Sequence, residues 1–245
     1  MEKFLLIAAV VALSACAPHT KMVVEPETPI AAFALPKTGW QAIVTGQDDR
    51  RVSDLSATWA SALAASKRFS KQIAREGELL MPDAARNHPA PPPGSYRCRL
   101  IKIGTAQGRE PAFQTFPEYF CHIRGDRADA LFFTKQTGTE LPGGWLHDDG
   151  ERRLILTGAK QHGINDAPLV YGTEPDRDLV GVVERIGPFR WRLVLPWRGE
   201  RQGLDVYELT PVPVEQQAAE PAPMPVEQQA AEPAPAQEGT ANAQP

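Results

Sequence analysis

Residues 176–197 read DRDLVGVVERIGPFRWRLVLPW, and this stretch decides the fold class. Short apolar runs lie on both sides of Gly187-Pro188, a dipeptide that signals a turn. Two strands are therefore predicted, at residues 179–186 and 190–195, and they are joined as an antiparallel hairpin.

Two registers of this hairpin are open. In the first, Glu184 faces Arg192, and Trp191 shares the opposite, buried face with Val183. In the second, Glu184 lies beside Trp191 and points into the core. A slip of one residue exchanges the two faces of a strand. We favour the first register because it leaves no lone carboxylate in the core. An inward Glu184 would be the strongest catalytic or ligand-orienting candidate in the chain.

Three arginines and one tryptophan lie on the two sides of the hairpin turn: Arg185 precedes it, and Arg190, Trp191 and Arg192 follow it. Arg185, Arg190, Trp191 and Arg192 would form a basic, aromatic-edged binding face if they shared one surface. Such a face suits anionic glycans or lipid headgroups. The alternative is a solvated strand face with cross-strand pairs, which is the commoner arrangement.

Short β-rich segments separated by turn residues fill the rest of residues 96–209. Further strands are predicted at residues 96–103, 118–124, 130–135, 144–147, 152–157, 169–171 and 204–209. Because long helical patterns do not alternate with these segments, a parallel α/β sheet is disfavoured. The spacing predicts an antiparallel meander that closes into a small barrel, with a sandwich as the alternative.

One amphipathic helix is predicted upstream, over residues 49–76. Apolar or small side chains recur there at intervals of three and four residues: Val52, Leu55, Trp59, Ala62, Ser66, Phe69 and Ile73. Asp48 suits the beginning of a helix, and Gly77 suits its end. The predicted fold class is α+β, with one long N-terminal amphipathic helix packed on the antiparallel meander.

The first residues predict export. A charged start and an apolar run at residues 4–13 precede small residues, which is the pattern of a secretory signal. The run is shorter than the about 20 apolar residues of a membrane-spanning helix. The motif LSAC at residues 13–16 resembles a bacterial lipobox, cut just before its cysteine. The resemblance implies that Cys16 is lipidated and anchors the protein in the envelope, facing the periplasm, and Ala17 favours the outer membrane.

Composition divides the chain into four parts. A lipoprotein signal peptide at residues 1–15 is followed by a Pro-containing linker at 16–39 and a globular domain at 40–210. The tail at 211–245 repeats the segment PVEQQAAEPAP, and such a composition buries too little apolar surface to order itself. The net charge of −4 and the absence of a basic stripe give no reason to expect nucleic acid as a partner.

The three cysteines of the chain are Cys16, Cys98 and Cys121. With Cys16 lipidated, Cys98 and Cys121 remain, both in predicted strands, and an oxidising envelope favours a disulfide between them. Two free, buried thiols are the alternative. A metal site on this pair lacks the Cys-x-x-Cys spacing.

Motifs for catalysis are sparse. His147-Asp148-Asp149 is the most metal-like cluster, but with Gly150 it has the composition of a hairpin turn. No Gly-x-Ser-x-Gly elbow and no phosphate-binding glycine loop occurs in the sequence. We therefore assign no catalytic residue, no metal ligand and no cofactor.

Several segments resemble a bacterial domain of unknown function, number 4893. They are PPPGSYRCRLIKIG at 91–104, FFTKQTGT at 132–139, and the stretch from YGTEP at 171 through LDVYEL at 204–209. The resemblance spans residues 40–209. It implies an exported, often lipid-anchored domain with the Cys98–Cys121 pair, and it supplies no activity.

The expected function is that of a lipid-anchored envelope protein acting as a binding or scaffolding module. Its partners would be envelope proteins or anionic glycans, bound by the Arg/Trp face or by the barrel mouth. The alternative is a hydrolase of cell-wall or lipid material, which requires a cleft lined by inward carboxylates such as Glu184, Asp176 or Asp178. A purely structural tether is a third interpretation.

Overall fold

The computed structural model describes residues 39–125, 131–138, 140–163, 166–199 and 201–213. The predicted signal peptide with Cys16, the linker as far as residue 38 and the tail from residue 214 lie outside the described residues. Within the described ranges, no helix is both long enough and apolar enough to cross a membrane.

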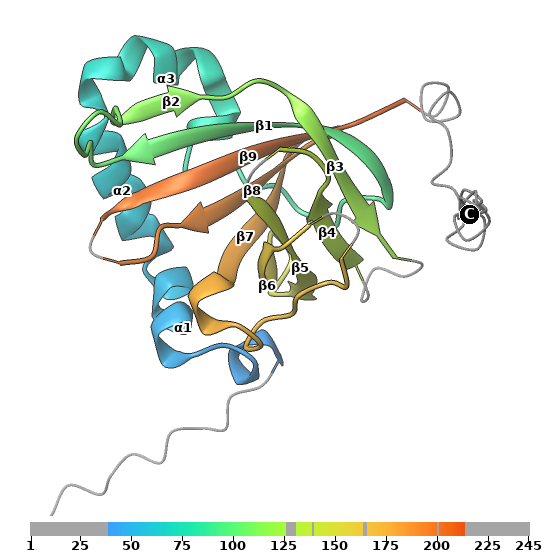
Figure 1. The fold of residues 1–245 in the computed structure, drawn as a ribbon. Coiled ribbons are helices and arrows are strands. Elements are labelled where there is room, and N and C mark those ends of the chain that lie inside the picture. Colours follow the sequence, from blue (N-terminus) through green and yellow to red (C-terminus); the bar gives the residue numbers. More distant parts are fainter. Residues whose placement is uncertain (1–38, 126–130, 139, 164–165, 200, 214–245) are drawn as a thin grey trace, which may run out of the picture. The chain divides into compact units, whose positions relative to one another are not determined.

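Nine antiparallel strands of the described part form one continuous sheet (Figure 1). In chain order they are β1 (Gly94–Gly104), β2 (Phe113–Thr115), β3 (Tyr119–Arg124), β4 (Leu131–Lys135), β5 (Leu141–Asp148), β6 (Leu154–Gln161), β7 (Asp178–Gly187), β8 (Arg190–Pro196) and β9 (Gly203–Pro211). Consecutive strands pair from β3 to β9, and β1 pairs with β2, β3 and β9. The pairing of β1 with β9 runs from Tyr96↔Pro211 to Gly104↔Gly203, so β1 and β3–β9 close into an eight-stranded barrel.

The helical segment before the barrel is made of short pieces. They are η1 (Gly39–Ala42), α1 (Gly46–Ser53), α2 (Leu55–Ala65), η2 (Lys67–Phe69), α3 (Ser70–Glu76) and η3 (Gly77–Leu80), and η4 (Pro175–Arg177) lies between β6 and β7. The predicted fold class is therefore wrong. The protein is a closed antiparallel β-barrel with short helices, and the single long helix over residues 49–76 does not exist.

Two polar residues interrupt the predicted helix. Asp54 and Ser66 both have ψ angles near 9°, outside the helical range, and each ends one helix. Ser66 is buried, and its hydroxyl donates to the Ala112 carbonyl at 2.5 Å and accepts from the Gly104 N–H at 3.3 Å. The hydroxyl thus binds backbone groups beside β1, and the chain turns at Ser66 to follow the curved barrel.

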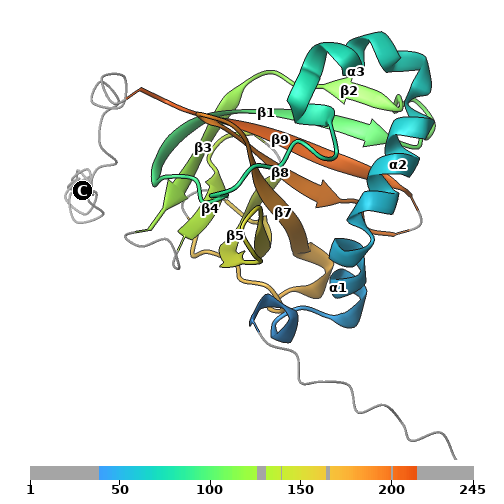
Figure 2. The same ribbon diagram turned by 180° about the vertical axis from the view of Figure 1, so that it is seen from behind.

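Two apolar layers hold the fold together. The barrel interior is filled by alternate strand residues, including Tyr96, Phe133 and Leu193. The outer layer lies between the short helices and the barrel wall, where Trp59 and Leu79 belong to the same buried cluster as the outward residues of the strands. Figure 2 shows the helices along one side of the barrel.

The predicted strand at residues 169–171 is also absent. Leu169 instead takes its backbone hydrogen bonds from the side chain of Gln161 at the end of β6. Its N–H donates to Gln161 Oε1 at 2.7 Å, and its carbonyl accepts from Gln161 Nε2 at 2.9 Å. The buried Gln161 amide therefore makes the hydrogen bonds to Leu169 that the backbone of a neighbouring strand would otherwise make.

Candidate functional site

The β7–β8 hairpin has the first of the two registers. Glu184 pairs with Arg192, and Val183 pairs with Leu193. Val183, Trp191 and Leu193 belong to the interior cluster, so Glu184 and Arg192 lie on the outer face of the barrel wall. Glu184 is nevertheless buried there beneath the chain that follows α3.

Arg192 binds the segment that follows α3 to the barrel wall through hydrogen bonds. Its side chain has no exposed surface, and Nε donates to Glu184 Oε2 at 2.6 Å. The guanidinium lies 5.0 Å from the centre of the Trp59 ring. It also donates to four backbone carbonyls, those of Glu78, Leu79, Met81 and Pro82. A cation that is buried with so many bonds made holds structure and cannot contact a partner.

The predicted Arg/Trp binding face is consequently divided. Trp191 lies in the barrel interior and Arg192 beneath the helical segment. Arg190 remains half-buried at the wall, where Nε donates to Glu208 Oε1 at 2.6 Å. Arg185, the register partner of Trp191, is half-buried as well. The structure does not bring these four side chains together on one surface.

A cavity of about 570 Å³ opens at one end of the barrel. We call it the barrel mouth; its lining includes Lys102, Glu110, Phe116, Glu140, Lys160, Asp176, Asp178, Leu179, Leu195, Trp197, Arg198, Arg201, Asp205 and Tyr207. These residues come from several strands and from the connections between β1 and β2, β2 and β3, β4 and β5, β6 and β7, and β8 and β9. The cavity therefore exists only because the barrel brings distant segments together.

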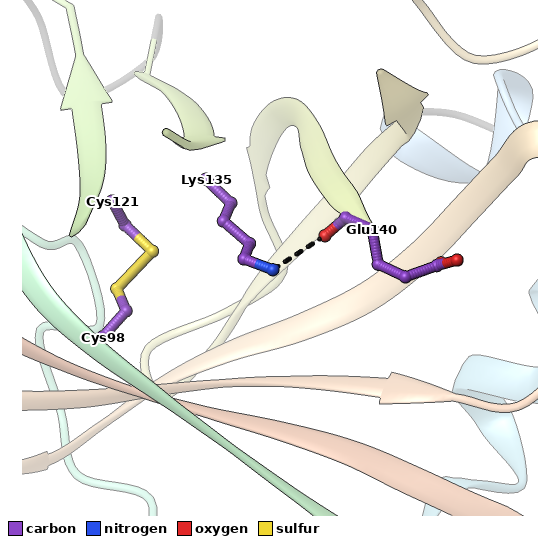
Figure 3. Close-up of a disulfide and its surroundings, with 4 residues drawn as sticks. All are labelled: Cys98, Cys121, Lys135 and Glu140. Atoms are coloured by element: carbon purple, nitrogen blue, oxygen red, sulfur yellow. Dashed lines mark hydrogen bonds between the residues drawn. A yellow bond between two sulfur atoms is a disulfide. The ribbon is translucent and has the colours of Figure 1, made fainter. Parts of the chain in front are cut away.

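Two lysines that line the mouth, Lys102 and Lys160, pair with carboxylates there, and a third, Lys135, bonds a backbone carbonyl beside them without lining the cavity. Lys102 Nζ on β1 lies 3.4 Å from Asp205 Oδ2 on β9. Lys160 Nζ on β6 lies 2.5 Å from Glu140 Oε2. Lys135 Nζ, from the end of β4, donates to the Glu140 backbone carbonyl at 3.1 Å (Figure 3). We call Lys102, Lys135 and Lys160 the lysine cluster.

Asp205 lies in the depth of the mouth. Its Oδ1 accepts from the Trp197 indole N–H at 2.6 Å. Burial raises the pKa of Asp205, and the Lys102 ammonium opposes that rise. Tyr207 follows on the same face of β9, and burial together with the Asp205 charge raises the pKa of its hydroxyl. The mouth thus brings together ionisable groups whose pKa values are shifted, which is typical of functional sites.

Tyr119 and Lys135 contact each other next to this group. Lys135 Nζ lies 4.5 Å from the centre of the Tyr119 ring. Burial lowers the pKa of Lys135 and raises that of Tyr119. Among the described residues, the buried Tyr119 hydroxyl has no hydrogen-bond partner, and Tyr119 does not line the mouth.

The predicted disulfide is present and joins β1 to β3. Cys98 and Cys121 are buried in the barrel interior with their Cα atoms 5.9 Å apart (Figure 3). Cys98 is the register partner of Tyr119, and Cys121 is the register partner of Lys135. The crosslink therefore joins β1 to the strand that carries Tyr119, and Lys135 lies on the neighbouring strand β4.

Arginines at the rim of the mouth are already bound to carboxylates. Arg198 Nη2 lies 2.8 Å from Asp48 Oδ2, and Arg201 Nη1 lies 2.7 Å from Glu110 Oε2. Arg201 also covers the Trp197 ring at 4.6 Å from its centre. The rim arginines thus form ion pairs with carboxylates of this chain, and these pairs stabilise the loops at the rim.

The three carboxylates predicted for a hydrolase do not lie in one cleft. Asp176 and Asp178 line the mouth, whereas Glu184 lies on the outer face of the barrel. Asp178 is buried and accepts the Gly172 N–H at 2.8 Å, while Asp176 is exposed.

The His147-Asp148-Asp149 cluster has other contacts. His147 Nε2 lies 2.8 Å from Thr157 Oγ1, and burial lowers the pKa of the imidazole. Asp149 accepts from the Trp40 indole N–H at 3.0 Å and pairs with Arg153 at 2.6 Å. In the described part of the chain, no group of three or more His, Cys, Asp or Glu side chains is placed to hold a metal ion.

The lysine cluster and Asp205 were not among the site residues predicted from the sequence. The signal was nevertheless there, because each of these residues continues the inward alternation of its strand. Lys102 follows Leu100, and Lys135 follows Phe133, at an interval of two residues. An inward polar residue at the end of an apolar strand indicates the polar end of a barrel once closure is known.

The fold and this site define a small, closed antiparallel β-barrel with a charged cavity at one end. The family model described as "Domain of unknown function (DUF4893)" matches residues 40–209, and the chain belongs to that family. No curated protein matches the chain.

Proposed function

We propose that this protein is a lipid-anchored module of the bacterial cell envelope that binds a small polar ligand in the barrel mouth. The observation that carries the proposal is the cavity itself. Its volume of about 570 Å³ lies within the about 300–1,000 Å³ that is usual for small-molecule sites. It combines apolar wall residues such as Leu179 and Leu195 with converging charged groups, and this combination gives a ligand both contact area and orientation.

Two observations support the envelope location. Residues 1–16 have the pattern of a lipoprotein signal ending at Cys16. The Cys98–Cys121 disulfide suits an oxidising compartment. Labelled palmitate should be incorporated by the wild-type protein and not by Cys16→Ala, and equal labelling of the two would contradict the anchor.

Binding in the mouth can be tested without knowing the ligand. The lipidated protein is purified from its own cells under mild conditions, and small molecules that co-purify are detected by native mass spectrometry. Leu179→Trp places an indole in the mouth and should remove the bound mass. The matched control is Leu63→Trp, because Leu63 lines a separate apolar groove of about 310 Å³ beside α2 and α3. Equal retention by both variants would contradict binding in the mouth.

A hydrolase is the second candidate, and Asp205 is the observation that favours it. A buried carboxyl with a raised pKa can act as a general acid, and Asp176 and Asp178 line the same cavity. We expect no turnover of peptidoglycan fragments or phospholipid vesicles by the full-length protein. Turnover that Asp205→Asn abolishes would replace the binding function with the hydrolase.

A further inference from the structure

Four exposed cations lie on the helical segment just after α2. Lys67, Lys71 and Arg75 are spaced four residues apart through η2 and α3, and Arg68 precedes Lys71 by three residues. Residues three or four apart lie on the same face of a helix. The four cations therefore form one basic strip, and we use this name for them below.

The carboxylates near the basic strip are bound elsewhere. Residues 59–86 contain five cations against three carboxylates. Glu76 Oε2 lies 2.6 Å from Arg99 Nη2 on β1, and Glu78 Oε1 lies 2.5 Å from Arg86 Nη2. Within the described ranges, no cation of the strip forms an ion pair. The strip thus presents its positive charge to whatever lies outside the protein.

The separate apolar groove beside α2 and α3 adjoins the basic strip. Lys67 belongs to both, because its side chain also lines the groove. Leu63, Ile73 and Leu80 supply apolar lining, and Met81 at the edge of the groove is 52% exposed. Cations and exposed apolar surface are therefore combined on this part of the molecule.

The other face of the helical segment is the one that packs on the barrel. Trp59, Ala62 and Leu79 are buried in the cluster that includes the outward residues of the strands. Figure 2 shows α2 and α3 on the outer side of the sheet. The basic strip and the groove are consequently left on the outer face of η2, α3 and η3.

A surface of this kind matches the surface of an anionic bilayer. Lys and Arg side chains are attracted to anionic headgroups, and each one near the surface adds to the attraction. Apolar side chains on the neighbouring face enter the boundary between headgroups and acyl chains. The basic strip and the groove with Met81 supply these two elements side by side.

The proposed lipid anchor would bring this face to a bilayer. Residues 17–38 separate Cys16 from Gly39, where η1 begins. A chain of this length spans at most about 80 Å. A tethered domain meets the membrane surface at a high effective concentration, so that contacts too weak to recruit an untethered protein are sufficient.

We propose that the outer face of η2, α3 and η3 docks on an anionic phospholipid bilayer, with the basic strip at the headgroups and Met81 at the apolar boundary. The inference goes beyond the proposed function and rests on it only for the anchor at Cys16. Docking gives the anchored barrel one defined orientation on the membrane.

The test places an environment-sensitive fluorophore at the groove. Met81→Cys is made in the full-length, lipidated protein and labelled without reductant, so that the Cys98–Cys121 disulfide stays closed. The protein is reconstituted into vesicles of phosphatidylcholine alone or of equal parts phosphatidylcholine and phosphatidylglycerol. Lipids brominated in their acyl chains quench a probe that reaches the apolar boundary. Quenching should be strong on the anionic vesicles and weak on the neutral ones.

A second probe position provides the matched control. Val170 is 44% exposed and precedes Tyr171, whose hydroxyl contacts Asp48 of α1 at 2.6 Å. Figure 1 shows α1 and α3 at opposite ends of the helical segment. The same fluorophore at Val170→Cys should therefore be quenched on neither kind of vesicle.

Single charge changes test the basic strip. Lys71→Gln, added to Met81→Cys, should lower the ratio of docked to undocked protein about fivefold, the effect of one basic residue at an anionic surface. High salt should lower the ratio as well. Arg124→Gln removes an exposed cation from β3 and should change nothing. Because both substituted side chains are exposed, urea unfolding should give the same midpoint for the two variants.

Three results would overturn the docking face. They are quenching at Met81 no greater than at Val170, equal quenching on neutral and anionic vesicles, and equal effects of Lys71→Gln and Arg124→Gln. Self-quenching that depends on protein density and not on brominated lipid would likewise replace the bilayer with a second copy of the chain.

Flotation of the same vesicles tests the anchor separately. Protein that floats with neutral vesicles while Met81 stays unquenched on anionic ones keeps the anchor and loses the docking face. Protein that does not float with neutral vesicles, but is quenched at Met81 on anionic ones, loses the anchor and keeps the docking face. Ligand binding in the mouth is decided by the mass-spectrometric test and by neither of these results.

Discussion

Arg192 Nε donates to Glu184 Oε2 at 2.6 Å across the β7–β8 hairpin, and neither side chain reaches solvent freely. The pair joins the barrel wall to the chain after α3, because Arg192 also binds the carbonyls of that chain. Charges removed from water in this way are costly unless every bond is made. The pair therefore specifies where the helical segment lies.

Removing Arg192 should destabilise the protein severely. Arg192→Met leaves the Glu184 carboxylate and several backbone carbonyls buried without their donor, and we expect a loss of about 3–5 kcal/mol in the free energy of unfolding. Urea unfolding measures it. The control is Arg190→Met on the same strand, whose half-buried pair with Glu208 should contribute about 1 kcal/mol. Equal losses in the two variants would contradict the role of Arg192.

Removing the disulfide should destabilise the barrel without changing its topology. The crosslink joins residues 23 positions apart, and closing a loop of this size contributes about 3 kcal/mol. The double variant Cys98→Ala, Cys121→Ala should unfold at lower urea concentration by the corresponding amount. The wild-type protein in reductant should match it under denaturing conditions. A variant as stable as the oxidised protein would show that the bond does not constrain the fold.

The glycine pair in β5 and β6 should tolerate no side chain. Gly144 is the register partner of Gly158, and a Cβ on Gly144 would lie 2.5 Å from the Thr157 carbonyl oxygen. Gly144→Ala must push backbone apart, so it should lower stability by about 1–3 kcal/mol. Gly46→Ala is the control, because a Cβ there meets nothing within 4 Å and alanine favours α1. Thermal unfolding distinguishes the two, and an unchanged Gly144→Ala would contradict the close approach.

The pH dependence of stability should report on Asp205. Its pKa is raised above the ordinary value of 3.8 by burial, so between the two values the folded state binds more protons than the unfolded state. The contribution of Asp205 to the free energy of unfolding is therefore greatest below pH 3.8, and it is lost as the pH rises through the raised pKa. Asp205→Asn keeps an acceptor for the Trp197 indole and removes the titration.

Comparing the wild type with Asp205→Asn shows in which direction the ionisation of Asp205 changes stability. The stability of Asp205→Asn relative to wild type should increase as the pH rises from about 3.8 towards neutrality. Unfolding by urea at a series of pH values measures the difference. Parallel profiles for the two proteins would mean that Asp205 ionises as easily in the folded state as in the unfolded state.

The strands were predictable from sequence, because alternation and turn signals are local. The hairpin at Gly187-Pro188 and its register are found as predicted, and each is set by the need to bury Trp191 and Leu193 together. The three-residue strand β2 escaped detection, because it forms only where β3 leaves the side of β1.

The breaks in the helical segment and the residues that line the mouth were not predictable, because both depend on how the closed barrel brings distant segments together. The apolar stripe through Trp59 continues past Ser66. Nothing in the local sequence shows that the Ser66 hydroxyl will bind the backbone of Gly104 and Ala112. The strand predicted at Leu169 was replaced by a side-chain amide from Gln161. The lysine cluster likewise becomes visible only when β1, β4 and β6 face one interior.

The most direct test of the account uses the Trp197 indole N–H as a reporter. This group donates to Asp205 inside the mouth, whereas Trp145 is 40% exposed and does not line the mouth. The full-length protein, labelled with ¹⁵N and held in detergent micelles, is titrated with a small-molecule extract of the cell envelope. Filling of the mouth should shift and saturate the Trp197 indole signal and leave that of Trp145 unchanged. A spectrum in which Trp197 stays constant throughout the titration would contradict ligand binding at the barrel mouth.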